Sequence, residues 1–147
     1  MAKSMTTGLN DVIFSMEELR SIPFKVISEM LVAAAPAVVD AQKKQFAEDG
    51  LIDRGNLSQS PGWVRPQVGR KGGGYLDVGP QGTNHTGGKG GESNTTNAEV
   101  AFVHEFGAPG RNIRATQSIR IATEESADKA VEEKMKVYDE WLTSLGL

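Results

Sequence analysis

Residues 79–97 read G-P-Q-G-T-N-H-T-G-G-K-G-G-E-S-N-T-T-N and contain no large apolar side chain. A segment of this composition cannot offset the entropy cost of ordering by burying side chains. The core must therefore come from the sequence on either side of it. We expect residues 79–97 to form a mobile loop in the isolated chain, and a loop of this length inside a small domain is commonly functional.

The chain has 147 residues, a length that suits one domain over residues 1–147. Hydrophobic residues make up 38% and aromatic residues 6%, so we expect a thin core built mainly from Ala, Val, Ile and Leu. Cysteine is absent, which excludes disulfides, thiolate metal sites and a cysteine nucleophile. No run approaches the ~20 apolar residues that cross a bilayer, so we expect a soluble protein.

Charge is unevenly distributed around the net value of −3. Between residues 61 and 91, Asp77 is the only acidic side chain, and the basic ones are Arg65, Arg70, Lys71 and Lys89. This excess is smaller than the basic surfaces with which proteins typically bind nucleic-acid phosphates. The four cations are nevertheless candidates for contact with DNA or with an acidic partner.

Apolar residues recur three and four positions apart over residues 23–49, which predicts a long helix. Pro23 suits its first position, Pro36 should kink its middle, and Gly50 suits a left-handed cap at its end. Its expected core face consists of Phe24, Ile27, Leu31, Ala34, Val38 and Ala41, with Phe46 near the end. Upstream, Ser15 begins a capping-box pattern, S-M-E-E, after an N-terminal arm of residues 1–14.

A second long helix is predicted over residues 118–144. Its expected core face consists of Ala127, Val131, Met135, Tyr138, Leu142 and Leu145, widened by Ile119, Ala122, Val137 and Trp141. Large aromatic side chains are enriched among interface anchors, so Trp141 is also an interface candidate.

Short strands are predicted at residues 63–69 and 75–78, joined by R-K-G-G-G into a hairpin with Pro66 at a sheet edge. The apolar run V-A-F-V predicts a buried strand within residues 98–111 that leads into a tight turn. Alternation along a strand would turn Val100, Phe102 and Phe106 toward the helices and partly cover His104. The expected fold is α+β: a long kinked N-terminal helix and a C-terminal helix packed on a small antiparallel sheet, with a long Gly-rich loop.

His104 and Glu105 begin like the zinc-protease pattern H-E-x-x-H, but Ala108 occupies the fifth position. A metal-dependent hydrolase centred on His85, His104 and Glu105 remains an alternative. The Gly-rich runs lack the strand before and the helix behind that a phosphate-binding loop requires. No set of nucleophile, base and acid stands out, so we expect a protein that is not an enzyme and uses no cofactor or metal.

Three separated stretches read R-G-N-L-S-Q-S (54–60), V-A-F-V-H-E-F-G-A (100–108) and R-A-T-Q-S-I-R-I-A (114–122). In this order they resemble the T-G-x-L-x-x-S segment, the V-E-F-G-T strand and turn, and the P-A-x-P-F-L-R-P-A start of the last helix in a protein family. That family comprises the neck and tail-completion proteins of tailed bacteriophages of siphovirus type. Arg54 stands where threonine is usual, and residues 117–119 replace P-F-L. With the helical flanks, the similarity covers most of residues 16–145.

The resemblance implies a structural subunit of the head-to-tail joining region, which forms a ring, commonly a hexamer, around the channel for genomic DNA. Implied partners are the portal-side connector or head-closure protein and the tail tube or tail terminator protein. The implied locations are the virion and, during assembly, the host cytoplasm. Candidates for ring or channel contacts are Arg65, Arg70, Lys71, Lys89 and Trp141. The alternative is a small nucleic-acid-binding module that uses the basic Gly-rich loop.

Overall fold

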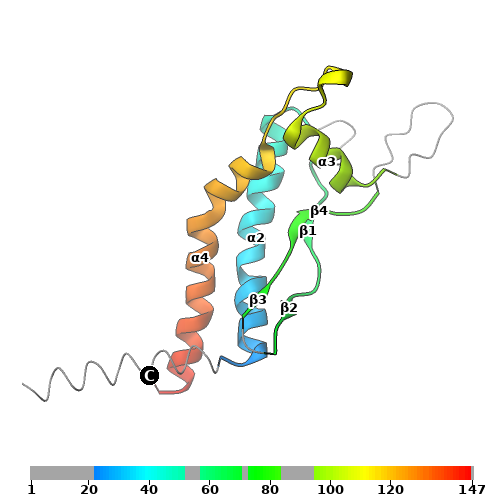
Figure 1. Ribbon diagram of the computed structural model, residues 1–147. Coiled ribbons are helices and arrows are strands. Elements are labelled where there is room, and N and C mark those ends of the chain that lie inside the picture. The colour runs from blue at the N-terminus through cyan, green and yellow to red at the C-terminus, as the bar shows by residue number, and fades with distance from the viewer. Residues whose placement is uncertain (1–21, 52–56, 71–72, 84–94, 147) are drawn as a thin grey trace, which may run out of the picture.

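The computed structural model of the chain describes residues 22–51, 57–70, 73–83 and 95–146 (Figure 1). Within these ranges the elements are α2 (Phe24–Glu48), β1 (Pro61–Trp63), β2 (Gln67–Val68), β3 (Gly74–Tyr75), β4 (Val78–Pro80), α3 (Asn97–Phe106), the 3₁₀ turn η2 (Pro109–Arg111) and α4 (Ser118–Ser144). The predicted α+β class is confirmed. The expected arm at 1–14, the capping box at Ser15 and residues 84–94 of the Gly-rich stretch lie outside the described residues.

Helix α2 has almost the bounds that the sequence predicts, and it runs unbroken through Pro36. Its C-terminal end is closed as expected by Gly50 in a left-handed conformation, φ 75°. The N–H of Gly50 donates to Ala47 O at 3.1 Å, and the N–H of Leu51 donates to Phe46 O at 2.8 Å. This pair of bonds is a Schellman motif, which satisfies the last carbonyl groups of the helix.

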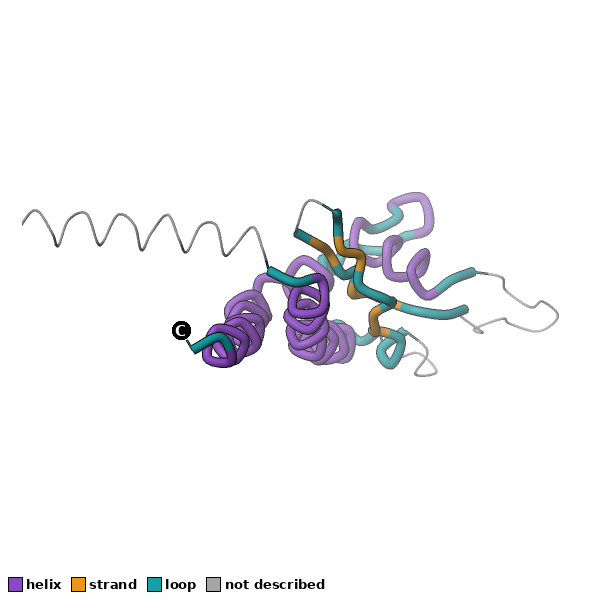
Figure 2. The backbone as a smooth tube through the Cα atoms, turned by 90° about the horizontal axis from the view of Figure 1, so that it is seen from below, coloured by secondary structure: helices purple, strands orange, loops and turns teal. Residues whose placement is uncertain are grey.

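Helix α4 lies antiparallel beside α2 (Figures 1 and 2). Its bounds match the prediction, and Ala122 is buried as expected, but the expected core residues Ala127, Val131, Met135 and Leu145 are exposed. The fully covered residues are small and four apart: Ser118, Ala122, Ser126 and Ala130. Val131 and Met135 are instead 56% and 45% exposed. Helix α2 also buries small residues, among them Ala34 and Ala37, so small side chains let α2 approach its neighbours closely, whereas Val131 and Met135 of α4 stay outside.

The four strands form one interrupted hairpin on the side of α2 opposite to α4 (Figure 2). Trp63 pairs with Val78 in the first ladder, and Val68 pairs with Gly74 in the second, both antiparallel. Residues 64–66 therefore oppose only residues 76 and 77, and this extra residue interrupts the ladder at Pro66. The hairpin is fastened to α2 by Gln42, whose Nε2 donates to Val78 O at 3.3 Å.

Residues 97–106 form a helix, so the predicted strand is wrong. The Thr96 hydroxyl accepts the N–H of Glu99 at 3.1 Å, and the Glu99 carboxylate accepts the N–H of Thr96 at 2.8 Å. This capping box fixes the start of α3. Phe102 and Phe106 are 62% and 66% exposed and do not face the helices as expected.

A buried apolar cluster lies where α2, α3, α4 and the segment at Leu57 come together. It contains Phe46, Leu57 and Ala101, against which Leu51, Val100 and Ile119 pack. Its small size agrees with the thin core expected from composition. In the described ranges, no helix is long and apolar enough to cross a membrane.

Candidate functional site

Three segments that are far apart in sequence meet around this core, and we call the place the three-helix junction (Asp49, residues 104–107 and residues 116–120). Ser118 Oγ donates to Asp49 Oδ2 at 2.5 Å, which joins the start of α4 to the end of α2. The N–H and the hydroxyl of Thr116 both donate to His104 O, at 2.8 and 3.1 Å. These bonds fix the direction in which α4 leaves the junction.

Glu105 caps α4 from the neighbouring helix. Its Oε2 accepts the N–H of Ile119 at 2.8 Å, and its Oε1 accepts the N–H of Arg120 at 3.1 Å. The N-cap residue itself, Gln117, is in a left-handed conformation, and its side chain accepts from Arg120 Nη2 at 2.5 Å. A carboxylate at the positive end of a helix dipole is favourable. Both oxygens of Glu105 therefore have a structural role.

Gly107 permits the close turn between α3 and α4. Its φ is 76°, and a Cβ at this position would lie 2.9 Å from Ala115 N and 3.0 Å from Ile113 O. The turn that follows is closed by two bonds between Ala108 and Ile113, at 2.9 and 3.1 Å. Only glycine fits here without displacing the backbone that leads into α4.

The described residues include two of the three predicted hydrolase residues, His104 and Glu105. His85 lies outside the described residues, and Glu105 is directed to the N-terminus of α4. Among the residues that the structure describes, no three His, Asp or Glu side chains gather as metal ligands.

The predicted contact residues separate into two groups. Arg65 and Arg70 are exposed on the same hairpin, and neither joins an ion pair within the described part of the chain. Lys71 and Lys89 lie outside the described residues. Trp141 is half-buried on α4, with its ring 5.9 Å from that of Tyr138, beside a hollow of about 410 Å³ between α4 and the start of α2.

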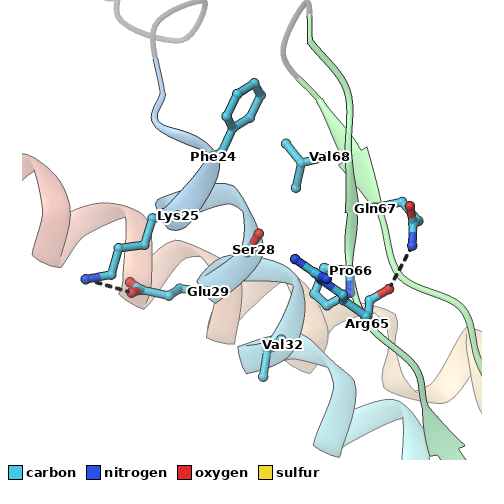
Figure 3. A pocket seen from close by; sticks show the side chains of 9 residues that line it. All are labelled: Phe24, Lys25, Ser28, Glu29, Val32, Arg65, Pro66, Gln67 and Val68. Atoms are coloured by element: carbon cyan, nitrogen blue, oxygen red, sulfur yellow. Dashed lines mark hydrogen bonds and ion pairs between the residues drawn. The ribbon is translucent and has the colours of Figure 1, made fainter.

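An open groove of about 810 Å³ lies between the first turns of α2 and residues 65–68 of the hairpin (Figure 3). Its apolar lining consists of Phe24, Val32, Pro66 and Val68. Figure 3 shows Phe24 and Val68 pointing toward each other across the groove, with Arg65 extending from the hairpin toward α2. The sequence prediction missed this groove because it assigned Phe24, which is 54% exposed, to the core.

A second apolar surface runs along α4, to one side of the face that carries the buried Ala122, Ser126 and Ala130. We call Val131, Met135, Tyr138 and Leu142 the outer stripe, because their spacing of four, three and four residues puts them on one helix face. Val131 and Met135 are exposed, and Tyr138 and Leu142 are half-buried. Sequence periodicity found these residues, but it could not tell which of the two apolar faces of α4 meets α2.

Helix α4 also carries ion pairs between side chains three or four residues apart. Lys136 donates to Glu133 at 3.0 Å and lies 3.7 Å from Glu132. The hydrogen bond to Glu133, together with both negative charges, raises the pKa of the Lys136 ammonium above its usual value. Glu132 is thus engaged within its own helix.

A third exposed apolar feature is the pair Phe102 and Phe106 on α3. Their ring centroids are 4.7 Å apart with the planes tilted by 54°. The two rings cover part of each other while most of their surface remains open to solvent.

Comparison of the chain with models of protein families, with curated proteins and with solved structures finds no significant match.

Proposed function

We propose that the chain is a structural subunit of the neck of a tailed bacteriophage, where it forms a ring around the DNA channel and joins the head to the tail. The ring, most simply a hexamer, lies between the portal-side connector or head-closure protein and the tail tube or tail terminator protein. The genomic DNA passes through its lumen in the virion. The chain acts by assembly and not by catalysis.

The observation that carries this proposal is that the three stretches resembling neck proteins each contribute to the buried cluster around Phe46. The first contributes Leu57 to the core, the second contributes Ala101, and the third contributes Ile119, which packs against them. Glu105 of the second stretch also accepts the N–H of Ile119 in the third. The second stretch is a helix in this chain and a strand in the family, so the support comes from the packing of the three stretches at one core cluster and from the turn at Gly107 that ends the second stretch.

The exposed apolar surfaces are consistent with a ring. In a cyclic ring each subunit uses two different surfaces, one for each neighbour. The groove between α2 and the hairpin and the outer stripe of α4 are two such surfaces, and they lie on different helices. The pair Phe102 and Phe106 adds a third surface, which suits contact with an adjacent layer of the neck.

A test is to produce phage particles in which the gene for this chain is disrupted, with complementation by the intact gene. The proposal predicts DNA-filled heads and free tails in the absence of the chain, and joined infectious particles when it is restored. Joined infectious particles without complementation would contradict the proposal.

The second candidate function is nucleic-acid binding, which the uncompensated Arg65 and Arg70 favour. If Arg65, Arg70, Lys71 and Lys89 each contacted a phosphate, the logarithm of the binding constant would fall against the logarithm of the salt concentration with a slope of roughly −3.6. Replacing the two arginines by glutamine would reduce this slope to about half. Filter binding of the purified chain measures this slope. A steep slope lost on the double substitution would favour the binding module, whereas the neck proposal requires no tight binding of DNA by the free chain.

A further inference from the structure

We propose that the outer stripe of one subunit docks in the groove of the next, so that this contact propagates around the ring. The inference rests on the proposed function and specifies which surfaces form the subunit interface. The occupant of the groove is a second copy of this chain, and the segment that binds is the C-terminal half of α4.

The groove offers an apolar floor with a positive rim. Phe24, Val32 and Val68 supply apolar surface, and Arg65 extends over it from the hairpin (Figure 3). Lys25 and Glu29, which also line the groove, form their own pair at 3.9 Å and contribute little net charge. The uncommitted charge at this groove is therefore that of Arg65.

The outer stripe offers an apolar ridge with a negative flank. Asp128 precedes Val131 by three residues and Asp139 follows Met135 by four, so both carboxylates lie on the same side of the stripe. Both are exposed, and neither joins an ion pair within the described ranges. Lys134 lies on the other side of the stripe, so the two flanks differ in charge and favour one orientation of the helix in the groove.

Charge complementarity selects the pairing of groove with stripe. Contact between two stripes would bring Asp128 and Asp139 of both copies together. Contact between two grooves would bring both Arg65 side chains together. Both arrangements are unfavourable, because like charges at an interface repel each other. A stripe in a groove instead brings Arg65 to the negative flank, where it meets one of the two aspartates, since these lie about 16 Å apart along the helix. At about 1.5 Å per residue the stripe is roughly 16 Å long, enough to lie along several turns of α2.

The positions of the two surfaces make the contact intermolecular. The lining residues of the groove belong to α2 and the hairpin. Helix α4 lies on the far side of α2 from the hairpin (Figures 1 and 2). A subunit therefore cannot place its own stripe in its own groove. A docked pair of subunits keeps one free stripe and one free groove, which is the requirement for a heterologous ring.

Complementary loss of the two surfaces tests this pairing. Phe24→Asp removes the groove contact and Val131→Asp removes the stripe contact, and both residues are more than half exposed in the subunit, at 54% and 56%. Each variant alone should be monomeric in sedimentation velocity under conditions where the unaltered chain associates. An equimolar mixture should give a heterodimer and no larger species, because one intact groove meets one intact stripe. Val64→Asp is the matched control, since Val64 is also 54% exposed but does not line the groove.

A mixture that stays monomeric, or a Val64→Asp variant as defective as Phe24→Asp, would overturn the pairing. Deletion of residues 1–21 identifies the other occupant. If this deletion abolishes association while Val131→Asp does not, the groove holds the N-terminal segment and the inference is wrong. Arg65→Glu should weaken the association constant about tenfold. A chain that carries Arg65→Glu together with Asp128→Arg and Asp139→Arg should regain it, because the charges of the two surfaces are then exchanged.

Cysteine cross-linking in assembled particles separates this inference from the proposed function. The natural chain has no cysteine, so a chain with Phe24→Cys and Val131→Cys should form a ladder of disulfide-linked oligomers, and one with Val64→Cys and Val131→Cys should not. If the double variant complements head-to-tail joining but gives no ladder, the groove–stripe contact is wrong and the neck function stands. If particles join without the chain, the neck function itself is wrong.

Discussion

Replacement of Glu105 tests the structural role assigned to the most conspicuous acidic residue of the chain. The side chain accepts two backbone N–H groups of α4, at 2.8 and 3.1 Å. A hydrogen bond to a charged group contributes about 1.5–3 kcal/mol. Because the bond to Arg120 is exposed, water can replace part of this loss, and we expect Glu105→Ala to lower the free energy of unfolding by about 2–3 kcal/mol.

Glu105→Gln keeps one carbonyl acceptor and removes the charge, so its cost should be about 1–1.5 kcal/mol. For a domain of this size the alanine variant should lower the Tm by roughly 4–12 °C. Urea denaturation followed by far-ultraviolet circular dichroism measures the free energies, and thermal unfolding measures the Tm.

Glu124→Gln is the matched control, because Glu124 is an exposed acid near the start of the same helix whose carboxylate lies 3.9 Å from Arg120. Its loss should cost less than about 0.5 kcal/mol. Equal stabilities of the Glu105→Gln and Glu124→Gln variants would refute the assignment of Glu105 as the cap of α4.

Two further substitutions test the packing around this junction. Gly107→Ala should lower stability by about 2–4 kcal/mol, because the added Cβ would lie 2.9 Å from Ala115 N at a φ of 76°, whereas a Cβ on Gly110 would meet no described atom within 4 Å. Comparable unfolding midpoints for Gly107→Ala and Gly110→Ala would argue against the close turn. Ala122→Leu should cost about 1–3 kcal/mol because Ala122 is fully buried against α2, and Ala127→Leu on the exposed side should change stability by less than about 0.5 kcal/mol. The opposite order of these two costs would mean that α4 packs through the face that the sequence suggested.

Local signals were sufficient to predict the two long helices. Pro23 and Gly50 delimit α2, and the glycine has the left-handed conformation expected of it. The hairpin pairing was also predicted, because R-K-G-G-G separates two short β-like runs. These features depend on near neighbours in sequence, so they can be predicted without knowledge of tertiary contacts.

The stretch that became α3 was predicted wrongly because four consecutive apolar residues fit a buried strand and a helix equally well. The deciding signal precedes the run: Thr96 and Glu99 have the spacing of a capping box, which starts a helix. With a helix in place of a strand, Phe102 and Phe106 fall on an exposed face, and Glu105 reaches α4 instead of a substrate.

The orientation of α4 could not be obtained from hydrophobicity alone. The stripe through Val131 and Met135 is the more apolar face, yet the face through Ala122 and Ser126 is the one that meets α2. Small residues four apart favour close helix approach, and the alanines of α2 supply the complementary surface. Recognising this pairing requires both helices at once, and it leaves the large side chains free for the interface that we infer.

The most direct test of the neck proposal is electron cryo-microscopy of intact particles of the host phage. The account predicts a ring between the head and the tail, around the DNA channel, into which the antiparallel pair of α2 and α4 fits once per subunit. It further predicts that the stripe at Val131 and Met135 faces the groove at Phe24 of the neighbouring subunit. A neck whose density is accounted for by other proteins, with this chain absent from the particle, would contradict the account.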